Sequence, residues 1–134
     1  MANGLARTTK MDDKTYKDAL GKAIGILFLS RTMAHMSHLQ TSSYAAHVAL
    51  NEFYDEILDL ADDLAEAAQG MYGKLDIPFI NTNGNIKDPI GMLQGHLRQL
   101  ESTMVNCDED WIMSIYQEIQ KLYRSTLYKL TELS

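Results

Sequence analysis

Hydrophobic residues recur every three or four positions along most of the chain, which is the spacing of a helix that buries one face. Three polar or irregular segments interrupt this pattern and divide the chain into four parts. The pattern predicts helices over about 13–38, 43–69 and 88–105, and a fourth from about residue 108 onward. There is no internal repeat and no low-complexity segment.

Local signals mark the ends of these helices. The polar run 40–43 breaks the first pattern and offers a serine hydroxyl to cap the second helix. Gly70 is expected to end the second helix, because glycine is common just past a helix C-terminus. Asp88 followed by Pro89 is a strong start for the third helix, with an acidic cap and a proline at the first helical position.

The segment 70–87 is rich in glycine and asparagine and is expected to be a loop. At about 3.3 Å per residue it is long enough to span the second helix, which is about 40 Å long. This length favours a crossover between helices that run parallel over a hairpin turn. We therefore expect an all-α four-helix bundle over residues 13–134, preceded by a flexible arm over residues 1–12.

The composition suits one globular domain, since 46% of the 134 residues are apolar and 22% are charged. The single cysteine, Cys107, excludes a disulfide within the chain and favours a reducing compartment. The longest apolar run, 23–29, is far shorter than the roughly 20 residues that span a bilayer. The N-terminus lacks a secretory pattern, so we expect a cytoplasmic protein with no membrane partner.

The charge of −6 is unevenly distributed along the chain. Between Arg31 and Lys74 there is no lysine or arginine, but there are seven carboxylates and three of the four histidines. His35 continues the apolar stripe of the first helix. On a wheel of about 100° per residue, four polar residues of the second helix lie at the border of its buried face. These residues are His47, Asn51, Asp62 and Glu66.

Histidines and carboxylates that face a helix interface form imidazole–carboxylate metal sites, which suit iron, manganese or zinc. The alternative is that the histidines are hydrogen-bonded core residues and the carboxylates form a solvated face. We prefer that alternative for four carboxylates of the second helix, Asp55, Glu56, Asp59 and Asp63. His38 and His96 are expected to be structural or exposed.

The stretch 35–70 resembles the Dps branch of the ferritin-like superfamily, the DNA-binding proteins from starved cells. In that family, two histidines twelve residues apart are followed after four residues by an acid. An Asp-x-x-Ala-Glu run closes the motif eleven residues further on. The residues of this chain at those positions are His35, His47, Asn51, Asp62 and Glu66. Small ferritin-like proteins encoded by tailed phages are similar too.

The resemblance implies a ferritin-like bundle with an iron site between two subunits. His35 and His47 of one chain would bind iron together with Asp62 and Glu66 of its mate, and Asn51 would offer its carbonyl oxygen. The implied reaction is oxidation of Fe(II), preferentially by hydrogen peroxide. Ferric mineral would then be stored in a dimer-based homo-oligomer, which is a dodecamer in the family. Carboxylates stabilise the ferric ion, and imidazoles add affinity for Fe(II).

Three positions depart from the family pattern. Asn51 replaces an acidic ligand, Met36 stands where the family usually has tryptophan, and Ala67 stands where it usually has arginine. These departures leave open an alternative of a different class. In it the chain is a non-catalytic helical oligomerisation or binding protein, phage-encoded, with a degenerate metal site and no ferroxidase activity.

A third hypothesis is DNA binding through residues 1–22, where five basic side chains stand against three aspartates. The basic residues are Arg7, Lys10, Lys14, Lys17 and Lys22. Such binding would be weak, salt-sensitive and independent of sequence, and the negative charge of the whole chain opposes it.

Overall fold

The computed structural model describes residues 12–81 and 84–134, and over these residues it contains four helices and no strand. The helices are α1 (Asp13–Gln40), α2 (Tyr44–Tyr72), α3 (Pro89–Thr103) and α4 (Asp110–Glu132). They confirm the all-α prediction, and their ends lie within a few residues of the predicted ones. The flexible arm predicted for residues 1–12 lies, apart from Asp12, outside the described residues.

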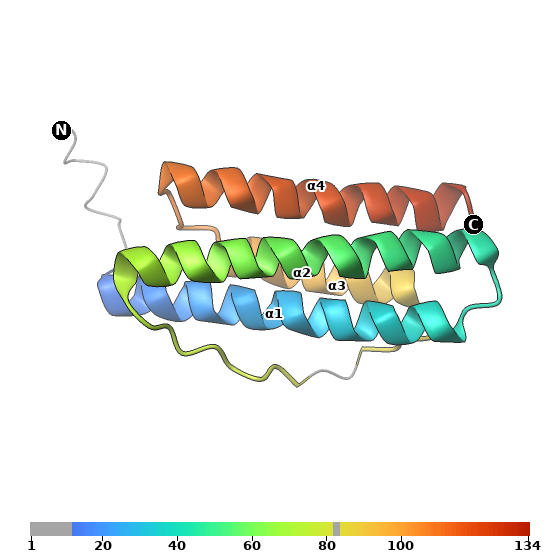
Figure 1. Ribbon diagram of the computed structural model, residues 1–134, viewed down its shortest axis with the longest axis horizontal. Coiled ribbons are helices and arrows are strands. Elements are labelled where there is room, and N and C mark those ends of the chain that lie inside the picture. The colour runs from blue at the N-terminus through green and yellow to red at the C-terminus, as the bar shows by residue number, and fades with distance from the viewer. Residues whose placement is uncertain (1–11, 82–83) are drawn as a thin grey trace.

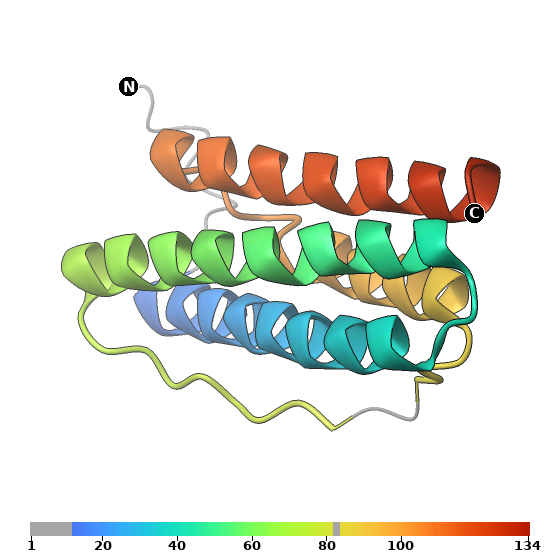
Figure 2. The same cartoon turned by 45° about the vertical axis from the view of Figure 1, so that its right-hand side comes forward.

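The four helices form a bundle in which α2 and α3 run in one direction and α1 and α4 run in the other (Figure 1, Figure 2). Helix α1 packs against α2 and α3, and α4 packs against the same two helices, so α2 and α3 lie diagonally across the bundle. The connection from α2 to α3 runs back along the length of the bundle beside α1 (Figure 1). This topology confirms the predicted crossover between parallel helices.

Side-chain caps begin three of the helices. At the start of α1, Asp12 accepts a hydrogen bond from the Thr15 N–H at 2.8 Å. At the start of α2, Ser43 accepts one from the Ala46 N–H at 3.1 Å. Asp88 caps α3, just before the proline at its first position. These bonds satisfy N–H groups that have no partner inside the helix, as the sequence predicted for α2 and α3.

The predicted end of α2 at Gly70 is wrong. The helix continues to Tyr72, and the glycine that ends it is Gly73, with a φ of 86°. The additional turn brings the Tyr72 ring onto the ring of Tyr16 in α1, with centroids 5.4 Å apart. Glycine at position 70 destabilises the helix by about 1 kcal/mol relative to alanine, and this tertiary contact offsets that cost.

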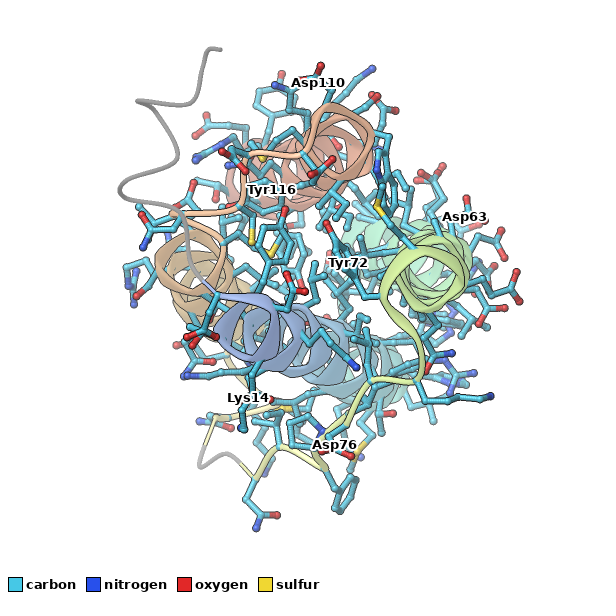
Figure 3. All side chains as sticks on the ribbon, turned by 90° about the vertical axis from the view of Figure 1, so that its left-hand side faces the viewer. Lys14, Asp63, Tyr72, Asp76, Asp110 and Tyr116 are labelled. Carbon is cyan, nitrogen blue, oxygen red and sulfur yellow. The ribbon has the colours of Figure 1, made fainter. Side chains whose placement is uncertain are left out.

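The crossover lies directly on the backbone of α1 at two glycines one helical turn apart. A Cβ atom at Gly21 would lie 2.0 Å from the carbonyl oxygen of Asp76, and one at Gly25 would lie 2.6 Å from that of Pro78. Since the obstructing atoms belong to the backbone, neither position has room for a side chain unless the crossover moves. Figure 3 shows the crossover passing beside α1 near the labelled Asp76.

The core between the helices is mainly apolar, but one chain of polar groups crosses it. The Tyr123 hydroxyl of α4 donates to Ser30 Oγ of α1 at 2.6 Å, and Ser30 Oγ lies 2.6 Å from Nδ1 of His96 in α3. The Ser30 hydroxyl thus links the phenol of α4 to the imidazole of α3. The other ring nitrogen of His96, Nε2, is buried and has no hydrogen-bond partner among the described residues.

Substitution of Gly21 by alanine should destabilise the protein, because the new methyl group meets the crossover backbone. The expected loss in the free energy of unfolding is about 1–3 kcal/mol, measured by urea denaturation. The matched control is Gly70→Ala in α2, where a Cβ atom would meet nothing within 4 Å. That control should stabilise the helix by up to about 1 kcal/mol. Equal effects of the two substitutions would contradict the close packing.

The buried His96 should make stability depend on pH. Burial lowers the pKa of His96 below its ordinary value of 6.5, so the folded protein keeps it neutral while the unfolded chain takes up a proton. The unfolded state then binds more protons, and the free energy of unfolding falls as the pH drops below about 6.5.

The effect of His96 is measured by comparing wild type with His96→Gln, which cannot titrate at this position. Wild type should lose more stability than the variant between about pH 7.5 and about pH 5.5. The other three histidines are common to both proteins, so their contribution cancels in the comparison. Identical losses would show that His96 is not held neutral in the folded state.

Candidate metal centre

The three histidines of the arginine- and lysine-free stretch gather where α1 turns into α2. The His38 and His47 rings stack with centroids 3.6 Å apart and an interplanar angle of 19°. The His35 ring stacks on Tyr54 at 4.1 Å, and Tyr54 also meets His38 edge-on at 5.3 Å. Tyr44 also stacks on His47 at 6.3 Å, so the turn between the helices produces one continuous cluster of five rings.

His38 and His47 hold each other through reciprocal hydrogen bonds to the backbone. His38 Nδ1 lies 2.7 Å from the carbonyl oxygen of His47, and His47 Nδ1 lies 2.9 Å from that of His38. Because a carbonyl can only accept, each Nδ1 carries the proton. Each neutral imidazole therefore has its lone pair on Nε2. A backbone bond at one ring nitrogen is the usual way in which a protein orients a metal-binding histidine.

The carbonyl oxygen of Asn51 is already engaged. The Tyr54 hydroxyl donates to Asn51 Oδ1 at 2.5 Å, and Asn51 Nδ2 donates to Asp55 Oδ2 at 3.4 Å. This is the oxygen that was expected to bind a metal ion. In the folded chain it would have to exchange the Tyr54 hydroxyl for the metal, or bind both.

Asp62 and Glu66 do not join the histidines within one chain. Asp62 follows His47 by fifteen residues, so the two lie about 22 Å apart along α2. Both carboxylates are exposed, whereas the wheel placed them at the border of the buried face. Leu64 and Ala68 occupy that face and leave the carboxylates in solvent. Among the described residues, no group of three or more His, Cys, Asp and Glu side chains is arranged to hold a metal ion.

The other carboxylates of α2 are placed as expected. Glu56, Asp59 and Asp63 are exposed, and Asp63 projects from the outer side of α2 in Figure 3. Glu52 pairs with Lys129 of α4 at 3.4 Å. The outer face of α2 is therefore mainly acidic.

His38 was expected to be structural or exposed, and it is structural, because it is buried and stacks on His47. Sequence reasoning missed the part that Arg31 has in this region. Arg31 lies one helical turn before His35, and its Nε is buried with no hydrogen-bond partner among the described residues. A guanidinium here opposes a cation at the histidines unless carboxylates are added from elsewhere.

The same end of the α1–α2 pair exposes large apolar side chains. Leu39 and Tyr44 are 69% and 80% exposed, and Met36 and Val48 are partly exposed beside them. Exposed apolar groups that gather at one place often mark a protein–protein contact. The chain thus combines oriented imidazoles with apolar surface at one end of the bundle.

Within the described ranges, none of the helices has the length and apolar character that crossing a bilayer requires. A family described as a family of unknown function, DUF5856, matches residues 38–130. An uncharacterised 14.6 kDa protein from the mobD–ri intergenic region of Enterobacteria phage T4 is 28% identical over 109 residues. That match covers 81% of this chain and 76% of the phage protein. No solved structure matches the chain.

Proposed function

The chain belongs to the DUF5856 family of unknown function, and we propose that it is a ferritin-like homo-oligomer that binds iron between two subunits. The observation that carries the proposal is the hydrogen bond from His47 Nδ1 to the carbonyl oxygen of His38 at 2.9 Å, which leaves the Nε2 lone pair of His47 available to a metal ion. The bundle with a central crossover and the similarity to a phage protein are compatible with the resemblance described above.

A second subunit is needed because one chain does not bring its donors together. His35 and His47 would come from one subunit, and Asp62 and Glu66 from the other. The exposed position of both carboxylates leaves them free to meet a partner. Their negative charge would also offset the Arg31 guanidinium beside the histidines.

Fe(II) is the substrate of the proposed site. Two Fe(II) ions would each give one electron to hydrogen peroxide, whose O–O bond would break to give two hydroxide ions, and the ferric product would be retained by carboxylates. Because Asn51 adds no charge, affinity should be lower than with an acid at this position. Zinc and manganese are bound by the same donor types, and zinc, which has no redox chemistry, serves as an inert probe.

The second candidate function is a non-catalytic helical assembly protein. The hydrogen bond from Tyr54 to Asn51 favours it, because the oxygen that a metal would use is occupied. Arg31 favours it too, since a partly buried guanidinium disfavours a nearby cation. In this case the histidine cluster would be a packing element of the α1–α2 turn.

The metal site predicts a specific pattern among variants. Anaerobic titration with Fe(II), and with Zn(II) as a probe, should show binding that His47→Ala and Asp62→Ala each weaken about tenfold or more. Asn51→Asp should strengthen it by adding a charged ligand. Asp63→Ala is the matched control, because this carboxylate is exposed on the same helix but lies outside the proposed donor set.

Both functions require a defined oligomer, which is measured by light scattering, and metal uptake by that oligomer separates them. A defined oligomer whose metal binding responds to His47 and Asp62 but not to Asp63 supports the iron site. A defined oligomer without metal uptake overturns it and favours the assembly protein. Equal binding by wild type, His47→Ala and Asp62→Ala would likewise place any bound metal elsewhere.

A further inference from the structure

A groove between α1 and α3 is lined only by hydrogen-bond donors and neutral groups. It is an open groove with about 400 Å³ of space over it, and its lining residues are Lys22, Gly95, Arg98, Gln99, Ser102 and Thr103. An ammonium, a guanidinium, two hydroxyls and an amide face one space, and no carboxylate lines it. A set of donors around a concave space suits an anion that carries several acceptor oxygens.

This groove is unusual on a chain with a net charge of −6. The groove between α2 and α4 is lined by Glu56, Asp59 and Glu118 around one lysine. Another groove, at the start of α1, mixes three lysines with three aspartates. In both of these, carboxylates neutralise the cations or outnumber them, so neither favours an anion.

The acids nearest to the two cations along their helices are held elsewhere. Asp18, four residues before Lys22, pairs with Lys14 at 2.9 Å. Glu101, three residues after Arg98, pairs with Arg124 of α4 at 2.6 Å. Neither Lys22 nor Arg98 takes part in any ion pair found among the described residues. Their charges therefore remain available to a ligand.

Gly95 keeps the groove open beside the guanidinium. A Cβ atom at this position would meet just one atom within 4 Å, Nη2 of Arg98 at 3.9 Å. Glycine inside a helix costs about 1 kcal/mol relative to alanine, and no neighbouring backbone requires it here. The missing side chain leaves space next to the Arg98 donors.

We propose that this groove binds the phosphate group of a small phosphorylated molecule. A phosphate presents a dense negative charge and several acceptor oxygens, which match the guanidinium fork, the ammonium and the hydroxyls. A nucleic acid fits less well, because two cations neutralise few phosphates and the aspartates at the start of α1 lie close to Lys22 along the helix. This inference is independent of the metal site.

The test is a titration of the full chain with inorganic phosphate and with adenosine monophosphate, followed by amide NMR at constant ionic strength. The shifts should saturate and concentrate at the groove, on Gly95, Gln99 and Ser102. Lys22→Gln and Arg98→Gln should each weaken binding about tenfold. Lys121→Gln, which removes a lysine from the acidic α2–α4 groove, is the matched control and should leave binding unchanged.

A second variant distinguishes the effect of the open space in the groove from the effect of its two cations. Gly95→Leu keeps both cations but fills the groove, and it should abolish phosphate binding while far-ultraviolet circular dichroism stays helical. Shifts that do not saturate, or that spread over the lysines at the start of α1, would overturn the proposal. Equal weakening by Lys121→Gln would overturn it as well. A short oligonucleotide that binds more tightly than adenosine monophosphate, and whose binding depends on Lys22 and Arg98, would show that the ligand of the groove is a nucleic acid and not a small molecule.

Discussion

The contact between the crossover backbone and α1 is the constraint on which the arrangement of the bundle depends. At one end, Gly21 and Gly25 let the crossover touch the helix backbone directly. At the other end, the Ser37 hydroxyl donates to the carbonyl oxygen of Ile86 at 2.6 Å. The chain is thereby held beside α1 at both of these places, and α3 has to begin at the end of the bundle where α2 also began. Parallel α2 and α3, diagonal to each other, follow from this path.

Helix α1 consequently has a neighbour on nearly every side. It meets the crossover through its glycines, α3 through Ser30 and α2 through the rings of His35 and His38. Helix α2 is left with a free outer face, which explains how its carboxylates stay exposed without loss of packing. The histidine cluster lies at the end where α1 and α2 are joined by a short turn, so the position of its rings depends on local geometry rather than on the crossover.

Much of the fold was predictable because periodicity and caps are local properties. Four helices, two of the caps and the crossover all followed from the order of residues along the chain. The end of α2 did not, because the contact between Tyr72 and Tyr16 is tertiary and overrides the signal of Gly70.

The site was less predictable for the same reason. A helical wheel gives the angle of Asp62 relative to its own helix, but not whether a neighbour covers that angle. Likewise, no wheel shows that His38 stacks on His47, because their contact depends on the turn between two helices. The glycines of α1 were visible in the sequence, but their role depends on a segment more than fifty residues away.

Local ion pairs determine which surfaces of this bundle keep an uncompensated charge. Lys14 and Arg124 each engage the acid that would otherwise neutralise a neighbouring cation, so the α1–α3 groove stays positive. The outer face of α2 stays negative, and α2 lies diagonally opposite α3. Neighbouring helix axes in a bundle are about 8–10 Å apart, so the diagonal exceeds the Debye length of about 8 Å at physiological salt. Solvent ions therefore weaken the interaction between the charges of these two surfaces.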